Sequence, residues 1–479
     1  MKKLAYISCI LVFVSNILAC NGVVENGDDI LLPPSPGNGV TYYVSTTGSD
    51  NNPGTQDAPW ATPGYASKQL EAGDTLIILG GTYVLSEYYE DMITLENSGA
   101  NDAWITIKGE EGNTPVLAGK DNLYSAVSFS DVSYIRIENL EITSDNGAWF
   151  RDGVNADDSI ISHIILSRLS IHHIDEFGMN LRDVDDLIVD NCNINHCGFG
   201  AIGGPAGESG GWRNVIIQKT RLSYNGHYYQ GGDGTNRPYD RPDGFGIEPS
   251  SGPIEIVDCV AEHNRGDGLD SKAENTYIHN CVVANNSCDG IKLWGGNSKV
   301  HNTLIYGTGD GEAGDTPWAA FVITTETANA NFEMANVTIH DTPKTHNYPM
   351  YVQYGSDVPI NLTMRNSIVA DGYGPVYIAE PVNFTAEHNL FYRSGNDVQV
   401  EANGREYTTQ QIESGALGEG NICKDPLFVK PAWGGIGDYH LKQGSPAIDS
   451  GMSGADIPAI DLEHNPRPKG NGYDIGAYE

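Results

Sequence analysis

A repeat of roughly 22 residues, a period short enough for a solenoid, constrains the fold of this chain more than any other feature. Cys259, Cys281 and Thr303 each follow a short β-rich run that ends in a polar residue, and they recur at equal intervals along the chain. This period is too short for a pair of helices and too rich in β-branched residues for a leucine-rich repeat. It fits one turn of a parallel β-helix, with Asn and Asp at corners that need left-handed backbone. The clearest runs are residues 187–192, 254–259, 277–281 and 300–303.

The N-terminal segment reads as a processing signal and not as part of the fold. Residues 1–20 combine a basic start with a short apolar stretch ending at Cys20, which resembles the signal peptide of a bacterial lipoprotein with Cys20 as the lipidated residue. Residues 21–40 are rich in Gly, Pro and Asp and are expected to form a flexible linker. We therefore expect a secreted monomer at the outer membrane or cell surface of a bacterium, in contact with the membrane only through its lipid anchor.

The remaining residues, about 440, exceed the size at which a single compact core stops growing, so an all-β solenoid is expected. Residues 41–125 are predicted to form an N-terminal cap and the first coils, 126–400 the catalytic β-helix, and 401–479 a C-terminal cap over the exposed strand edges. Residues 42–45 with 73–83, and residues 439–449 with 465–478, resemble the two ends of right-handed β-helix proteins, which predicts a right-handed parallel β-helix.

The charge balance limits the class of partner. Acidic residues outnumber basic ones by 63 to 27, for a net charge of −36. This excess argues against nucleic acid as the partner. An acidic polymer can be bound only through a local cation, which points to a metal.

A second strand in each coil should present one outward residue between two that face the core. Aligned by its apolar residues, this strand has the triads 177–179, 199–201, 245–247, 269–271 and 291–293. The outward column then reads Gly178, Gly200, Gly246, Asp270 and Lys292. A favoured Asp-Gly corner would explain an isolated aspartate, but not why an aspartate and a lysine interrupt a column of glycines.

Carboxylates also recur just before this strand, at Asp243, Asp267 and Asp289. Stacked coils lie about 4.8 Å apart, so Asp243, Asp267 and Asp270 should converge on one outer face, with Lys292 one coil beyond. Carboxylates this close repel one another unless a cation neutralises them, and a hard cation with oxygen ligands is the usual solution. The sequence therefore predicts a Ca²⁺ site.

Lys292 is the candidate base. A free lysine titrates near about 10.4, and a neighbouring cation together with partial desolvation is expected to lower the pKa of Lys292. Calcium on a uronate carboxylate would acidify the C5 proton, Lys292 would remove that proton, and the glycosidic oxygen at C4 would leave.

Three segments carry a specific resemblance: residues 242–245 (PDGF), 266–270 (GDGLD) and 290–296 (GIKLWGG). They resemble, in the same order, the three motif segments of polysaccharide lyase family nine, whose pectate lyases and rhamnogalacturonan lyases have a ten-coil parallel β-helix. The resemblance implies that Asp243, Asp267 and Asp270 bind calcium and that Lys292 is the Brønsted base. The resemblance to this family is close from residue 243 to 302, whereas the rest of the chain resembles only the broad class of β-helix proteins.

One departure concerns the metal site. The family usually has two aspartates before the middle glycine, whereas here the first position is Gly266. Asp289, Glu248 or water would have to supply the missing ligand. Lys272 is a second candidate base, and Lys292 is preferred because the column of Lys272 follows no motif of the family.

An insertion is expected beside the site, because the stretch from Cys197 to Asp243 is about twice as long as one ordinary coil. Its Arg237 and Arg241, together with Trp294 and Lys272 on the coils, are candidates for contact with sugar rings and uronate carboxylates.

The function predicted from these features is calcium-dependent cleavage of α-1,4-linked galacturonate, in pectate or pectin, by β-elimination. The acidic plant-type polysaccharide is the expected partner. A lyase for rhamnogalacturonan I or another uronate polymer is an alternative with the same machinery. A polygalacturonase-like hydrolase would need a carboxylate pair but no lysine. In a non-catalytic glycan-binding surface β-helix, Asp270 and Lys292 would be dispensable.

Overall fold

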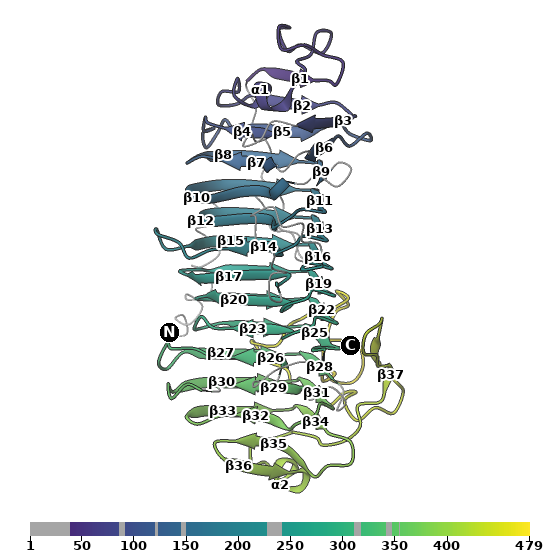
Figure 1. Cartoon of the computed structure of the whole chain (residues 1–479). Coiled ribbons are helices and arrows are strands. Elements are labelled where there is room, and N and C mark those ends of the chain that lie inside the picture. The colour runs from purple at the N-terminus through teal and green to yellow at the C-terminus, as the bar shows by residue number, and fades with distance from the viewer. Residues whose placement is uncertain are drawn as a thin grey trace, which may run out of the picture.

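The computed structural model describes residues 39–479 except 86–91, 120–122, 145–149, 228–241, 311–317, 342–346 and 354. The predicted signal peptide with Cys20, and the linker up to residue 38, lie outside the described residues. Within them the chain winds into coils whose strands pair in parallel with the coils before and after (Figure 1). This is the parallel β-helix that the short repeat predicts.

Each coil contributes strands to three parallel stacks. Stack 1 contains β4 (Ile93–Leu95), β7 (Leu123–Phe129), β14 (Gly200–Gly204), β17 (Phe245–Ser250), β20 (Leu269–Ala273), β23 (Ile291–Leu293), β26 (Ala319–Ile323), β29 (Tyr348–Val352), β32 (Val376–Ile378) and β35 (Val398–Ala402). Stack 2 contains β1 (Thr41–Val44), β2 (Thr75–Ile78), β5 (Ile105–Gly109), β8 (Ser133–Glu138), β15 (Trp212–Gln218), β18 (Ile254–Val257), β21 (Thr276–His279), β24 (Lys299–His301), β27 (Asn331–Ala335), β30 (Ile360–Arg365) and β33 (Val382–Glu387). The long strands β10 (Phe150–Ser167) and β12 (Phe177–Asp190) run through both stacks.

Stack 3 forms a separate sheet of short strands. It contains β3 (Thr82–Leu85), β6 (Val116–Gly119), β9 (Glu141–Ser144), β11 (Ser170–His172), β13 (Asn193–Asn195), β16 (Arg221–Ser223), β19 (Val260–Glu262), β22 (Val282–Ala284), β25 (Leu304–Tyr306), β28 (Thr338–His340), β31 (Ile368–Ala370) and β34 (Leu390–Tyr392). The side chains that point inward from the three stacks form one apolar core along the solenoid, because alternate residues of every strand face the same interior.

The corners after stack 2 have the left-handed backbone that the sequence predicts. Asp258, Asn280, Asn302, Asn336 and Asn366 all have positive φ, between 42° and 56°. Asn and Asp tolerate this conformation better than other residues with a Cβ, because their short polar side chains form local hydrogen bonds. Arg168, Lys219 and His388 occupy the same corner after β10, β15 and β33, so Asn and Asp are common there without being required.

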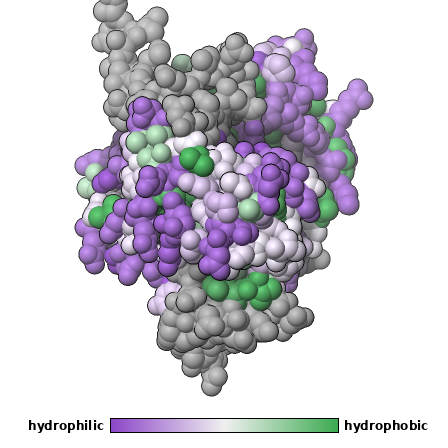
Figure 2. Space-filling view, turned by 90° about the horizontal axis from the view of Figure 1, so that it is seen from above, coloured by the Kyte–Doolittle hydropathy of each residue, from purple (hydrophilic) through white to green (hydrophobic). Residues whose placement is uncertain are grey.

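The two ends of the solenoid differ. A short helix, α1 (Pro63–Ser67), packs beside β1, β2 and β4 at the N-terminal end, while β36 (Arg405–Thr408) pairs antiparallel with β35 and leads into helix α2 (Thr409–Glu413) at the other. Seen from the N-terminal end, most of the coloured surface is hydrophilic, and hydrophobic residues gather in small patches (Figure 2). None of the helices in the described ranges is long and apolar enough to cross a membrane.

After α2 the chain turns back along the side of the solenoid, through β37 (Phe428–Lys430) and β38 (Asp438–Leu441) (Figure 1). The corner asparagines hold this returning segment. Asn302 donates to the carbonyl of Ile460 at 2.8 Å, and Asn336 donates to that of Gly476 at 3.0 Å. Residues 401–479, predicted as a cap, thus comprise a closing strand and helix followed by a segment that is bound along one side of the coils.

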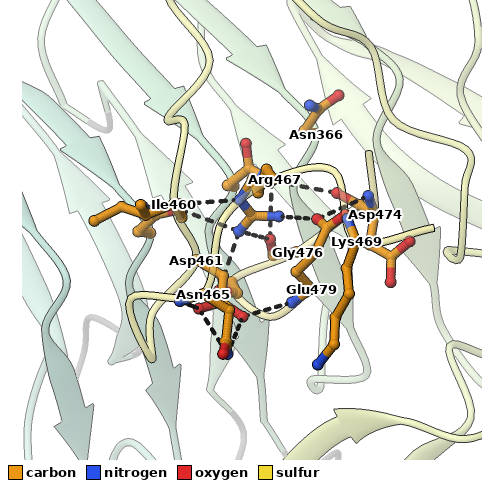
Figure 3. Close-up of polar contacts among 12 residues, drawn as sticks. Asn366, Ile460, Asp461, Asn465, Arg467, Lys469, Asp474, Gly476 and Glu479 are labelled. Carbon is orange, nitrogen blue, oxygen red and sulfur yellow. Dashed lines mark hydrogen bonds and ion pairs between the residues drawn. The ribbon is translucent and has the colours of Figure 1, made fainter. Parts of the chain in front are cut away.

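Arg467 is the centre of this attachment (Figure 3). Its guanidinium lies 2.9 Å from the carboxylate of Glu479, and it also donates to the side chain of Asn302 and to the carbonyls of Ile460, Gly476 and Ala477. Both charged side chains are excluded from solvent. The pair therefore joins the end of the chain to a corner of the solenoid.

Candidate active site

The predicted outward column exists on stack 1 where β17, β20 and β23 adjoin. Gly246 pairs with Asp270, and Asp270 pairs with Lys292, in consecutive coils. The apolar residues on either side of each, such as Leu269 and Ile291, are buried in the core. The alternation of buried and outward residues therefore sets Asp270 and Lys292 side by side, as the sequence predicts.

The alignment predicted for the preceding coils is wrong. Gly246 pairs with Gly203 and not with Gly200, because the strand β14 aligns Ile202 with Phe245. Gly178 faces inward, since a Cβ built on it would meet the side chains of Ile194 and Cys197. An apolar residue followed by glycine occurs twice here, at residues 199–200 and 202–203, and the pattern alone favours the wrong one.

A ladder of aspartates runs beside this column. The backbone N–H of Asp267 donates to Oδ1 of Asp243 at 2.7 Å, and that of Asp289 donates to Oδ1 of Asp267 at 2.8 Å. Oδ1 of Asp289 in turn accepts from the N–H of Ala319. Oδ1 of each carboxylate thus accepts a hydrogen bond from a backbone N–H of the next coil, which leaves Oδ2 for other partners.

A second ladder, of buried asparagines, supports the turn before each aspartate. Asn225 donates to Asn264, and Asn264 donates to Asn286, both at 2.9 Å. The glycine that follows an aspartate lies against these side chains: a Cβ on Gly268 would come within 2.7 Å of the Asn286 amide. The sequence signal for this ladder is Asn-x-x-Asp at residues 264–267 and 286–289, which a reading of the strands alone overlooks.

Asp243, Asp267 and Asp270 form one cluster, in which one carboxylate oxygen from each lies within 4.8 Å of the others. Burial and the charges of the other two aspartates raise the pKa of Asp243 well above its usual value. Burial, followed by the charge of Asp267, raises the pKa of Asp270 to about 8. Ionising all three together is therefore unfavourable without a cation.

The residues present fit a divalent cation with oxygen ligands. Oδ1 of Asp270 is buried and accepts no hydrogen bond from the residues that the structure describes. A buried carboxylate oxygen normally has a donor or a cation beside it. Carboxylates that converge in this way are the ligands that Ca²⁺ prefers.

Lys292 lies against the same cluster. Its Nζ is 3.5 Å from Oδ2 of Asp267 and 3.3 Å from Oδ2 of Asp289, and its side chain is one-fifth exposed. Burial lowers the pKa of Lys292, but the charges of Asp267, Asp289 and Asp270 outweigh burial and raise the pKa above its usual value. Carboxylates thus surround the ammonium group, and the lowered pKa predicted from the sequence depends on a cation beside these carboxylates.

The two residues suggested to replace the ligand missing at Gly266 lie outside the cluster of three aspartates. Asp289 faces Lys292 through Oδ2, and burial with the charge of Asp267 raises its pKa to about 7. Glu248 instead forms an ion pair with Lys272, with 2.6 Å between Oε1 and Nζ. Lys272, the alternative base, is thus already paired.

Trp294 lies beside both lysines. The centre of its indole is 5.3 Å from Nζ of Lys292 and 5.7 Å from Nζ of Lys272. Contacts of this kind between a cation and a ring restrict the lysine side chains. Arg237 and Arg241, the other candidates for substrate contact, lie outside the described residues.

Comparison with known proteins places this chain in a family. The model of the Pel9A-like right-handed β-helix region matches residues 42–301, which include the three clustered aspartates and Lys292. Pectate lyase PEL9 of Emericella nidulans is 28% identical over 128 residues, 24% of this chain and 30% of that protein. YwoF of Bacillus subtilis, an uncharacterised protein, is 29% identical over 137 residues, 28% of this chain and 27% of that protein. The matched region thus spans less than a third of either relative.

A solved structure agrees on the fold. The crystal structure of pectate lyase Pel9A superposes with a TM-score of 0.51 at 16% identity and covers 92% of this chain and 96% of that one. At this identity the likeness concerns architecture alone, and it extends across the coils on both sides of the aspartate cluster. The right-handed parallel β-helix predicted from the sequence is confirmed, and the chain belongs to the Pel9A-like right-handed β-helix family.

Proposed function

We propose that this protein is a calcium-dependent polysaccharide lyase that cleaves α-1,4-linked galacturonate by β-elimination. The observation that carries the proposal is the register of stack 1: Lys292 lies one coil from Asp270, and the carboxylates of Asp243, Asp267 and Asp270 converge beside it. This arrangement combines a candidate cation site with a nitrogen base on the outward face of one strand stack.

Asp243, Asp267 and Asp270 would hold the calcium ion. When bound, the ion neutralises the uronate carboxylate of the substrate and so acidifies the proton on C5. Lys292 in its neutral form takes that proton at Nζ, and the electron pair forms the C4–C5 double bond while the C4–O bond breaks. The departing glycosidic oxygen is protonated by water.

The protonation state of Lys292 links the base to the metal site. Its pKa is raised because the aspartates face it without a cation between them. Lys292 can act as a base only when the charge of these carboxylates is engaged elsewhere. The proposal therefore predicts that activity requires the metal even for a substrate that binds without it.

The direct test is an ultraviolet assay for unsaturated sugar ends. The purified protein is incubated with polygalacturonate, rhamnogalacturonan and alginate, each with calcium and with a chelator. We expect absorbance to rise on a galacturonate-containing polymer only with calcium. No rise on any uronate polymer would refute the lyase proposal.

The base is tested by Lys292→Ala, which should lower kcat by about 10²- to 10⁴-fold, the usual contribution of a general base. Lys299→Ala is the matched control, because Lys299 is half-exposed on stack 2 and pairs with Glu333. An equal rate for Lys292→Ala and wild type would refute the mechanism even if the protein is a lyase.

The location of the protein is part of the same proposal. An enzyme for pectic polysaccharide must act outside the cell, which agrees with the signal-peptide pattern of residues 1–20 and lipidation at Cys20. Metabolic labelling with a fatty-acid analogue, compared with Cys20→Ala, tests the anchor.

A further inference from the structure

The outward column of stack 1 continues beyond Lys292 with residues of a different kind. Lys292 pairs with Val322, Val322 with Tyr351, and Tyr351 with Tyr377, each one coil further along. Val322 and Tyr377 are partly exposed. The strand surface that carries the aspartates and Lys292 therefore becomes apolar and aromatic in the three coils that follow.

The aromatic rings in these coils form one cluster. Tyr351 and Tyr377 lie 4.9 Å apart between ring centres at an angle of 33°, and Tyr348 lies 5.1 Å from Tyr351. Tyr351 is 9% exposed, whereas Tyr348 and Tyr377 are each partly exposed. Tyr351 thus supports two rings that reach the surface.

The backbone beneath the cluster fixes the position of its rings. A Cβ built on Gly374 would come within 2.2 Å of the Tyr348 ring, so the ring lies directly over this glycine. A side chain held in place before its ligand arrives loses less conformational entropy on binding. The Tyr348 ring is consequently preorganised.

We propose that Tyr348 and Tyr377, supported by Tyr351, bind the sugar units of the polysaccharide that lie two and three positions from the unit attacked by Lys292. Coils are about 4.8 Å apart, a spacing comparable with the length of one sugar unit. A chain that lies along stack 1 would place one unit over Lys292, the next over Val322, and the following ones over the tyrosines. This inference rests on the proposed function, since it takes Lys292 as the point of cleavage.

Recognition here uses ring faces and not charge. Aromatic rings pack against the apolar face of a pyranose, and the tyrosine hydroxyl can hydrogen-bond to sugar hydroxyls. Between Lys292 and the last position of the column, Glu401, the paired residues carry no charge. Burial is the largest cause of the raised pKa of Tyr348; the charge of Glu401 adds to it and that of Arg393 opposes it.

The test measures binding of galacturonate oligomers by calorimetry, in calcium, with protein carrying Lys292→Met to prevent turnover. Tyr377→Ala in this background should lower the affinity for a long oligomer, of at least seven units, about tenfold. The dimer and trimer are too short to reach Tyr377 from Lys292, so their affinity should stay the same. Tyr377→Phe, which keeps the ring, should bind the long oligomer within about twofold of its parent, and the weakening by Tyr377→Ala should persist at high ionic strength.

The outcomes separate this inference from the proposed function. If the protein with Lys292 intact binds long oligomers in a Tyr377-dependent manner but never cleaves them, the lyase proposal fails and the binding surface stands. If it cleaves, and Tyr377→Ala and Tyr348→Ala leave the affinity for long oligomers unchanged, the surface is refuted. Equal loss for short and long oligomers, or no binding of any oligomer, also refutes it. Unfolding midpoints identify a variant that has simply lost its fold, and Tyr377→Leu, which also removes the ring, then replaces it.

Discussion

Two buried groups of charges in this protein are built in opposite ways. Around Arg467, each carboxylate has donors: Glu479 accepts from Arg467 and from the backbone N–H groups of Lys469 and Asp474. In the cluster of Asp243, Asp267 and Asp270, carboxylate oxygens face one another, and Oδ1 of Asp270 has no donor within the described ranges. The first group is complete within the chain, while the second is open to a cation, and this difference separates a structural ion pair from a candidate functional site.

Breaking the complete group should have the largest effect on stability. Arg467→Met leaves the buried Glu479 carboxylate without its cation, and removing one partner of a buried pair costs about 3–5 kcal/mol. We expect a lower unfolding midpoint in calorimetry and faster proteolysis of residues 425–479. Lys469→Met is the control, because Lys469 is exposed and contacts Glu479 only through its backbone. An unchanged midpoint for Arg467→Met would contradict a structural role.

The incomplete group should respond in the opposite direction. Asp270→Asn removes a repelling charge, so the metal-free protein should become more stable, while kcat/KM in calcium should fall about 100-fold with the loss of a ligand. Thermal unfolding with chelator and the ultraviolet assay measure the two effects.

Glu248→Gln is the matched control, because Glu248 pairs with Lys272 outside the cluster. If Asp270→Asn destabilised the metal-free protein as Arg467→Met does, the contrast between the two groups would be lost.

The incomplete group should also make stability depend on pH. The folded-state pKa is about 8 for Asp270 in this group and about 7 for its neighbour Asp289, above the value of about 3.9 for an unfolded aspartate. The metal-free folded state therefore binds more protons, and its stability should fall as pH rises from about 4 to about 8.

Calcium competes with these protons, so its stabilising effect should be larger at pH 8 than at pH 5. Unfolding midpoints with and without calcium across this range measure the effect. Equal calcium stabilisation at both pH values would contradict the assignment of Asp270 to the metal site.

A smaller effect is expected from the glycine beneath the cluster. A Cβ on Gly246 would lie 2.8 Å from Oδ2 of Asp243, so Gly246→Ala should displace this carboxylate and weaken calcium binding about tenfold. Calorimetric titration with calcium measures the change. Gly435→Ala serves as the control, since a Cβ there meets no atom within 4 Å.

The site was predictable where the coils keep a constant length. Asp267, Asp270 and Lys292 lie on adjacent coils that match the repeat and contain no insertion, so counting along the chain gave the correct register. Counting failed at Gly200, where the stack continues through Gly203 instead. It also missed the tyrosines, because the coils that lead from Lys292 to Val322 and from Val322 to Tyr351 are both longer than the repeat.

The sequence by itself determined the solenoid and the identity of the three clustered aspartates and Lys292. The repeat period, the β-branched residues and the corner asparagines all reflect local backbone preferences. Such preferences can be read from short stretches of sequence. Tertiary structure alone decided that Asp289 faces Lys292 while Glu248 pairs with Lys272. It also decided that the aspartates accept hydrogen bonds from the next coil. The same holds for the contacts of Arg467 with Glu479 and Asn302. These contacts join residues up to 165 positions apart, and such contacts depend on how coils of unequal length stack, which no local pattern records.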